Sequence, residues 1–173
     1  MGNPQGNTPS LNIAVLTISN HRTEENDSSG DYLQQAVEHA GHRVVERAIC
    51  PDNRYAIRAI VSQAIASPHI QVVLINGGTG FHEQNTTPEA IVPLFDKEIT
   101  GFGELFRMFS FEQIQQATLQ SRAVAGLANK TVIFAFPGST SACQLAWEQI
   151  IDAQLDINTT PCNFVSQLKK VSP

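Results

Sequence analysis

The sequence has few cysteines, and no two of them lie close together. Cys50, Cys143 and Cys162 are odd in number and share no Cys-x-x-Cys spacing. Neither a disulfide framework nor a cysteine-based zinc site is therefore indicated. We expect three buried or free thiols in a reducing compartment, which favours a cytoplasmic location.

Long apolar runs and an excess of positive charge are also missing. No run approaches the roughly 20 residues that span a membrane. Eleven Lys and Arg against sixteen Asp and Glu leave a formal net charge of −5, so a broad nucleic-acid surface is not expected. Residues 1–10 lack the basic start and apolar stretch of a secretory signal, and we interpret them as a loose tail.

What remains is typical of one globular domain. The chain has 173 residues, of which 42% are hydrophobic and 16% are charged. We place the domain at residues 11–170. Short apolar runs rich in β-branched residues predict strands at 12–18, 43–49, 70–75, 122–126 and 131–136. Amphipathic or capped segments predict helices at 27–40, 53–66, 87–95, 101–117 and 139–151.

This alternation predicts a doubly wound α/β fold, in which a mostly parallel sheet carries helices on both faces. Ligands of such sheets bind beyond the carboxyl ends of the strands. We therefore expect the loops after Ile18, Ile49, Ile75 and Phe136 to share one crevice. The segment 102–111 holds more large apolar groups than one buried helical stripe can use, which predicts an interface between copies of the chain.

The sharpest feature is Gly77-Gly78-Thr79-Gly80, which directly follows an expected strand. Glycine permits positive φ angles and the close approach of a ligand. Successive amide N–H groups in such a turn can bind an anion. The segment lacks the Lys-Ser/Thr of a P-loop and the third glycine of a dinucleotide fingerprint. From composition alone, an anion cradle and a simple tight turn both stay open.

Two further loops carry polar groups at the same expected edge. Pro137-Gly138-Ser139 is either a second anion site at a helix N-terminus or, as we favour, a helix cap. Asp52 is either a cap or a ligand of Mg²⁺, which prefers one or two carboxylates plus substrate oxygens. Glu104 is either a solvated helix residue or an acceptor for the paired N–H groups of a pterin ring.

Seven short segments occur together in the order of a known family. They are Ser19-Asn20-His21-Arg22, Asp27-Ser28-Ser29-Gly30, Pro51-Asp52-Asn53-Arg54, Gly77-Gly78-Thr79-Gly80, Thr87-Pro88-Glu89-Ala90, Gly101-Phe102-Gly103-Glu104-Leu105-Phe106-Arg107 and Pro137-Gly138-Ser139. Across residues 12–170 the chain resembles the molybdenum cofactor biosynthesis protein B family. That family is related to the molybdopterin adenylyltransferases and to the N-terminal domain of gephyrin.

The resemblance implies a homo-trimer or hexamer of doubly wound domains. It implies a site for molybdopterin, a pterin with a dithiolene and a terminal phosphate. The adenylyltransferases transfer AMP from Mg-ATP to that phosphate. The resemblance further implies other molybdenum cofactor biosynthesis proteins as partners.

Matched position by position, the resemblance makes Asp52 a catalytic acid and the Mg²⁺ ligand. It assigns Glu104 and Ser139 to the pterin side of the site. The segments that surround the substrate contribute Ser19, Gly77, Gly78, Thr79, Gly80, Pro137 and Gly138.

At Asn85 the sequence departs from the adenylyltransferases, which have a second acidic residue at this catalytic position. Asn76 and Asn20 stand where many relatives have Thr and Asp. An amide oxygen is neutral, so the chain offers Mg²⁺ one carboxylate fewer. Two functions stay open: an adenylyltransferase that uses Mg-ATP, and a non-catalytic carrier or scaffold for molybdopterin in the same pathway.

Overall fold

The computed structural model describes residues 8–171, and most of the expected tail at residues 1–10 lies outside this range. The described residues form a six-stranded sheet. Its order is β2 (Arg43–Cys50), β1 (Asn12–Ile18), β3 (Val72–Asn76), β6 (Thr131–Phe136), β5 (Val124–Ala128) and β4 (Lys97–Glu98). The first four strands are parallel, and β5 and β4 each run antiparallel to the preceding strand of this order. The mostly parallel sheet expected from the sequence is confirmed.

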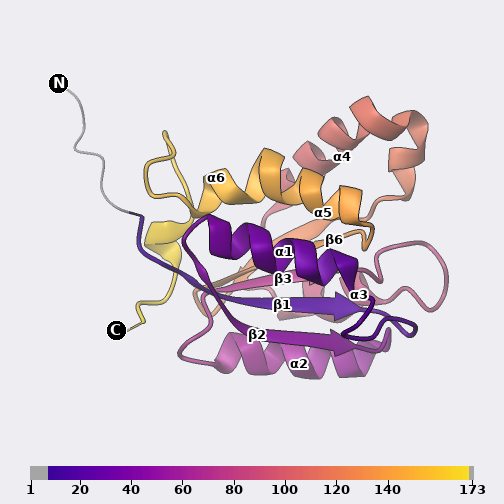
Figure 1. Cartoon of the computed structure of the whole chain (residues 1–173), viewed down its shortest axis with the longest axis horizontal. Coiled ribbons are helices and arrows are strands. Elements are labelled where there is room, and N and C mark those ends of the chain that lie inside the picture. The colour runs from indigo at the N-terminus through magenta and orange to yellow at the C-terminus, as the bar shows by residue number, and fades with distance from the viewer. Residues whose placement is uncertain (1–7, 172–173) are drawn as a thin grey trace.

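Helices cover both faces of this sheet, as Figure 1 shows. One face carries α1 (Ser28–His39), α4 (Thr100–Ile114) and α5 (Thr140–Ala146), which share a core with the sheet. The other face carries α2 (Arg54–Ala66) and α3 (Thr87–Ile91), which form a separate core. The doubly wound α/β fold is therefore confirmed.

The central strands are buried on both sides, which explains their continuous apolar sequence. All seven residues of β1 are buried. Ile13 and Val15 belong to the core beneath α1, whereas Ala14 and Leu16 belong to the core beneath α2. Alternate residues of a strand point to opposite faces, so one strand contributes to both cores.

Polar side chains begin the helices where the sequence indicated caps. The Asp27 carboxylate accepts a hydrogen bond from Gly30 N at 3.0 Å, at the start of α1. The Asn53 amide oxygen accepts from the second and third backbone amides of α2 at 3.0 and 3.1 Å. Ser139 Oγ accepts from Ala142 N at 3.2 Å and so caps α5. The capping interpretation of Ser139 is confirmed.

The structure departs from the expected elements at the edge and at the last helix. The two-residue strand β4 was not expected, since so short a segment carries no periodic pattern. The strand expected at 122–126 is β5, two residues further along. The helix expected to end at 151 continues through a π-helical segment, Trp147–Ile151, into α6 (Asp152–Leu155).

The helix α4 presents large apolar groups to both sides. Phe102 and Phe106 are buried against the sheet, whereas Leu105, Met108 and Phe111 are between 42% and 53% exposed. The exposed residues recur every three positions, so they share one side of the helix. None of the helices in residues 8–171 is long and apolar enough to cross a membrane.

Candidate functional site

A hollow of about 490 Å³ lies where the connections of the sheet diverge. β1 and β3 are neighbours, but the strand after β1 lies on one side of them and the strands after β3 lie on the other. Loops separate at such a switch point and leave room for a ligand. The lining residues are Thr17, Ile18, Ser19, Arg22, Asn76, Gly77, Gly78, Thr79, Gly80, Asn85, Ile114, Ala117, Gln120, Ser121, Pro137 and Gly138.

The hollow brings together most of the residues singled out from the sequence. They are Ser19, Gly77, Gly78, Thr79, Gly80, Asn85, Pro137 and Gly138. The loops after β1, β3 and β6 therefore share one crevice, as expected. Asp52, after β2, does not line the hollow itself but lies within hydrogen-bond distance of Asn85. Ser139 caps α5 and Glu104 is exposed on α4, outside the lining, so their assignment to the pterin side stays a prediction.

The backbone of the glycine loop requires glycine at two positions. Gly77 has a φ of 97° and Gly78 a φ of 65°. A Cβ atom at Gly77 would clash with the carbonyl oxygen of Ile18, and one at Gly78 would clash with the hydroxyl of Thr87. A Cβ at Gly138 would lie 2.9 Å from the Cα of Gly77, so the loops after β3 and β6 touch. A tight turn is thus present, as one of the two interpretations of the sequence predicted.

The carbonyl groups of this loop have hydrogen-bond partners, whereas most of its amides do not. Gly77 N donates to Phe136 O at 3.0 Å, while the carbonyls of Gly77 and Gly78 accept from Thr87 Oγ1 and N at 2.9 and 3.0 Å. Within residues 8–171, no hydrogen bond uses the amide nitrogens of Gly78, Thr79 or Gly80. Buried backbone donors almost always have a partner. Three successive amides without a partner, in residues that line a hollow, are the kind of donors that an anion needs.

Arg122 holds the other side of the loop, a role that the sequence analysis did not detect. Its Nε donates to Thr79 O at 3.0 Å, and its Nη2 donates to Gly80 O and Asn85 O at 2.6 and 2.9 Å. The guanidinium also forms an ion pair with Glu89 and lies 5.1 Å from the centre of the Phe81 ring. Arg122 thus binds the carbonyls of Thr79 and Gly80, so the amides of this loop are its polar groups without a partner in residues 8–171.

The Asp52 carboxylate accepts three hydrogen bonds from neighbouring protein groups. Asn85 Nδ2 donates to its Oδ2 at 3.0 Å. Thr86 N and Oγ1 donate to its Oδ1 at 3.0 and 3.1 Å. Asp52 N in turn donates to Asn20 Oδ1 at 3.0 Å. Of the three asparagines noted as departures in the sequence, Asn85 and Asn20 therefore both bind Asp52.

This arrangement does not fit a protein-held Mg²⁺. The residues described by the structure contain no group of three or more His, Cys, Asp or Glu side chains arranged around a metal position. Asp52 and Asp27 each accept a hydrogen bond from a residue that lines the hollow, Asn85 and Thr17, and Asp27 is also paired with Arg47. Mg²⁺ requires anionic oxygens that are free to coordinate it. We therefore derive no reaction step through a metal.

Asn76 carries an unmatched acceptor at the base of the hollow. Its Nδ2 donates to Thr17 Oγ1 at 2.9 Å and approaches Leu16 O at 3.3 Å. Its Oδ1 is buried with no partner among the described residues. An unmatched buried oxygen costs about 1–3 kcal/mol, which favours a donor supplied at this position by a ligand or by solvent.

The fold and this crevice define a doubly wound α/β protein whose glycine loop lines a hollow, and comparison with known proteins gives its family. A family model described as "Probable molybdopterin binding domain" matches residues 14–156. Molybdenum cofactor biosynthesis protein B of Escherichia coli strain K12 is 63% identical over 158 residues, covering 91% of this chain and 93% of that protein. The protein of that name from Bacillus subtilis strain 168 is 42% identical, covering 82% and 84%.

Comparison with solved structures indicates the same family as the sequence relatives. A crystal structure of a molybdenum cofactor biosynthesis protein B superposes with a TM-score of 0.83 at 40% identity, covering 86% of this chain and 92% of the other. The tungsten cofactor synthesizing protein MoaB from Pyrococcus furiosus gives 0.74 at 35% identity, covering 82% and 90%. The chain belongs to the molybdenum cofactor biosynthesis protein B family.

Proposed function

We propose that the protein binds molybdopterin during molybdenum cofactor biosynthesis and holds its terminal phosphate on the amides of Gly78, Thr79 and Gly80. The observation that carries the proposal is the polarity of this loop. Its carbonyls are bound by Thr87 and Arg122, whereas its three amides are open to the hollow. A phosphate supplies several acceptor oxygens for such amides. The name of the matching domain family supports a pterin as the remainder of the ligand.

Within this proposal the protein acts as a carrier or scaffold rather than as an adenylyltransferase. An adenylyl transfer depends on positioning and on a metal that neutralises the phosphate charge. Here Asn85 donates to Asp52 where a metal-binding site needs a second carboxylate. Transfer from Mg-ATP is the second candidate function, and the position of Asp52 beside the hollow favours it.

Titration calorimetry separates the two candidates. The ligands are molybdopterin, its dephosphorylated form and ATP with and without Mg²⁺. A carrier that uses the amide loop binds molybdopterin at least about tenfold more tightly than the dephosphorylated form, since several charge-assisted hydrogen bonds are lost. Equal affinity for both forms contradicts the proposal. Release of pyrophosphate at about one turnover per second or faster supports the transferase instead.

Two glycine variants provide a matched control. Gly78→Ala and Gly41→Ala both place a Cβ on a backbone of positive φ, 65° and 85°. A Cβ at Gly41 meets nothing within 4 Å, and this residue lies in the turn after α1. We expect both variants to lose stability by about 1 kcal/mol or more. Only Gly78→Ala should lose molybdopterin affinity.

Assembly, partners and location complete the proposal. The exposed apolar side of α4 supports association of copies into the trimer or hexamer expected from the resemblance. The partners we propose are other molybdenum cofactor biosynthesis proteins, which deliver or receive the pterin. The reduced thiols expected from the sequence favour the cytoplasm as the location.

A further inference from the structure

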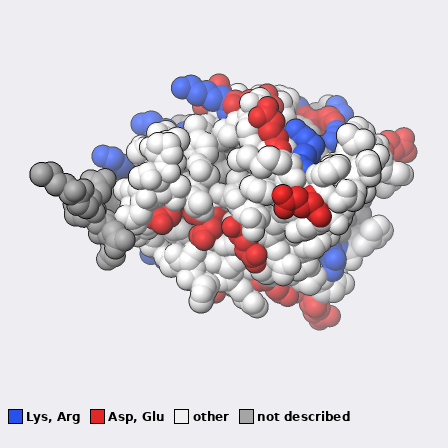
Figure 2. Space-filling model, turned by 90° about the horizontal axis from the view of Figure 1, so that it is seen from above, with Lys and Arg blue, Asp and Glu red and all other residues white. Residues whose placement is uncertain are grey.

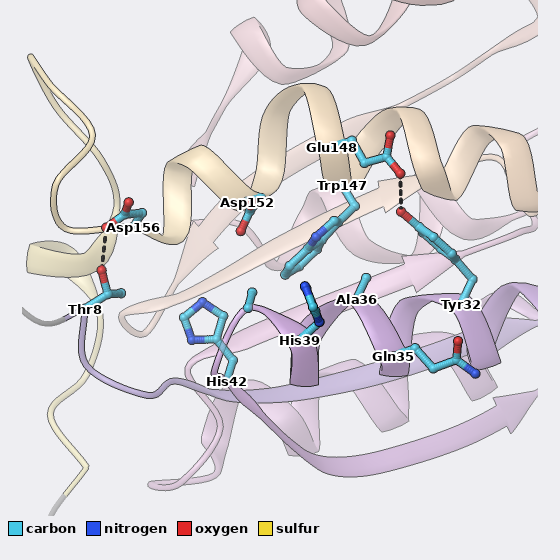
Figure 3. Close-up of a pocket in the computed structure, with 11 residues that line it drawn as sticks. Thr8, Tyr32, Gln35, Ala36, His39, His42, Trp147, Glu148, Asp152 and Asp156 are labelled. Carbon is cyan, nitrogen blue, oxygen red and sulfur yellow. Dashed lines mark hydrogen bonds between the residues drawn. The ribbon is translucent and has the colours of Figure 1, made fainter.

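A second hollow, with a volume of about 660 Å³, shares no residue with the hollow at the glycine loop. One wall is the side of α1 that carries Tyr32, Ala36 and His39. The other wall is the helical path from Trp147 into α6, as Figure 3 shows. We call this hollow the α1–α6 groove.

The charges of the α1–α6 groove are of one sign. Glu148, Asp152 and Asp156 line it at four-residue intervals, and none of its lining residues is Lys or Arg. Carboxylates four residues apart on a helix repel one another. Figure 2 shows acidic side chains across the middle of this helical face with few basic ones among them. The groove therefore concentrates negative charge that the protein does not neutralise.

The carboxylates are only partly used by the protein. Tyr32 Oη donates to Glu148 Oε1 at 3.0 Å. Thr8 Oγ1 donates to Asp156 Oδ1, which also accepts from the backbone of Asn158 at 2.9 Å. Asp156 Oδ2 and both oxygens of Asp152 accept no hydrogen bond from residues 8–171. Oxygens of two neighbouring carboxylates are thus available to a cation.

Two side chains that line the groove, Trp147 and His42, are more than nine-tenths buried, and each carries an N–H group with no protein partner in residues 8–171. Trp147 is 4% exposed, and its indole N–H makes no hydrogen bond within the described chain. His42 is 6% exposed, and its Nδ1 accepts from Leu11 N at 3.2 Å. The proton of the neutral ring is therefore on Nε2, which has no partner. In Figure 3 the His42 ring points into the groove, on the side of Asp152 and Asp156.

These donors restrict the chemistry of the ligand. A nitrogen that carries a proton cannot bind a metal, and the described residues contain no cluster of three metal-binding side chains. The N–H groups of Trp147 and His42 are free to donate to an acceptor such as a carbonyl oxygen of a ligand. The ligand therefore presents cations to the carboxylates and carbonyls to Trp147 and His42. A polypeptide with basic side chains has both.

We propose that the α1–α6 groove binds an extended, arginine-bearing segment of a partner protein. The three carboxylates follow one another along the groove, from Glu148 in the π-helical segment through Asp152 in α6 to Asp156, which ends α6. Alternate residues of an extended chain point to the same side at intervals of about 6.6 Å, so an Arg-x-Arg sequence presents two guanidinium groups to one wall of the groove. Guanidinium groups pair with carboxylates through two parallel bonds.

Fluorescence provides a direct test, because Trp147 is the only tryptophan of the chain. The probe is the peptide acetyl-Ala-Arg-Ser-Arg-Ala-amide, added to the full-length protein with excitation at a wavelength selective for tryptophan. We expect a saturable change in emission that weakens as salt is raised. The matched peptide acetyl-Ala-Gln-Ser-Gln-Ala-amide should produce no saturable change.

Variants assign the effect to the groove. Asp152→Asn and Asp156→Asn should each weaken peptide binding about threefold to fivefold, and together about tenfold or more. The control pair Glu24→Gln and Glu112→Gln removes the same charge from exposed positions outside the groove and should leave affinity unchanged.

Equal binding by the two double variants, or no saturable change up to millimolar peptide, overturns the proposal. So does a change in emission with protein concentration alone, which assigns the groove to a second copy of the chain. Molybdopterin binding at the other hollow should be unaffected by the groove variants.

Discussion

Asn85 Nδ2 lies 3.0 Å from Asp52 Oδ2 and donates a hydrogen bond to it. At that separation a second carboxylate requires a shared proton or a cation between the two groups. The amide removes this requirement, since it supplies an N–H group and no charge. The pair is therefore stable without a metal, and the presence of Asn at position 85 is consistent with a site for binding rather than for adenylyl transfer.

Replacing Asn85 with Asp should make the protein dependent on Mg²⁺. Asn85→Asp changes almost no volume, but it removes the donor and brings two like charges together. We expect the free energy of unfolding to fall by about 1–3 kcal/mol in metal-free buffer. Millimolar Mg²⁺ should restore the lost stability, because the cation takes the place of the lost hydrogen bond. Thermal unfolding with and without Mg²⁺ measures both effects.

The same variant tests the transferase. We expect Asn85→Asp to raise AMP transfer from Mg-ATP to molybdopterin, and Asp52→Asn in the same background to remove the gain. The native protein should show no stabilisation by Mg²⁺. Stabilisation of the native protein equal to that of the variant contradicts the account, because it means that another group already holds the metal.

Arg122 should control affinity through the loop that it holds. Arg122→Lys keeps the charge but not the planar donor fork that binds Thr79 O and Gly80 O. We expect molybdopterin affinity to fall about tenfold with a loss of stability of about 1 kcal/mol. Calorimetry with molybdopterin and its dephosphorylated form should show that the loss is confined to the phosphorylated ligand.

Arg58 offers a matched comparison for this variant. Its guanidinium also donates to two backbone carbonyls, Ala90 O at 3.1 Å and Glu89 O at 3.0 Å, and it lies 5.7 Å from the Tyr55 ring centre. Arg58 does not line the hollow. Arg58→Lys should therefore cost similar stability and leave molybdopterin affinity unchanged. If both variants lose affinity equally, Arg122 is a structural residue only.

The sequence predicted the fold and most of the hollow because both depend on local signals. Strands such as β1 are recognisable from continuous apolar residues, and the glycine loop from residues that tolerate positive φ. Arg122 gave no such signal. Its partners lie 37 to 43 residues earlier in the chain, so only the pairing of distant strands brings them together. The strand β4 was missed because its two residues are too few to carry a periodic pattern.

His42 should make the protein sensitive to acid. Burial lowers the pKa of His42 below its ordinary value, and the charges of Asp152 and Asp156 only partly oppose this. Below pH of about 6.5 the unfolded chain binds a proton that the folded ring resists, so stability should fall as pH falls from that value toward the folded pKa. Thermal unfolding between about pH 5 and 7 measures the slope. His42→Gln should reduce it, whereas His69→Gln, at an exposed position, should not.

The last prediction concerns the exposed side of α4. Met108 is 53% exposed and lies between Leu105 and Phe111 on that side. A carboxylate buried at an apolar interface is strongly unfavourable, so Met108→Glu should dissociate the assembly while the monomer stays folded. Light scattering at micromolar concentration measures the mass, and circular dichroism verifies the fold. Glu112→Gln, an exposed change on the same helix, serves as the control. Ile114, at the end of α4, lines the hollow at the glycine loop. If the interface fixes this end of the helix, dissociation should also weaken molybdopterin binding. A native protein that is already monomeric at micromolar concentration would contradict the proposed assembly.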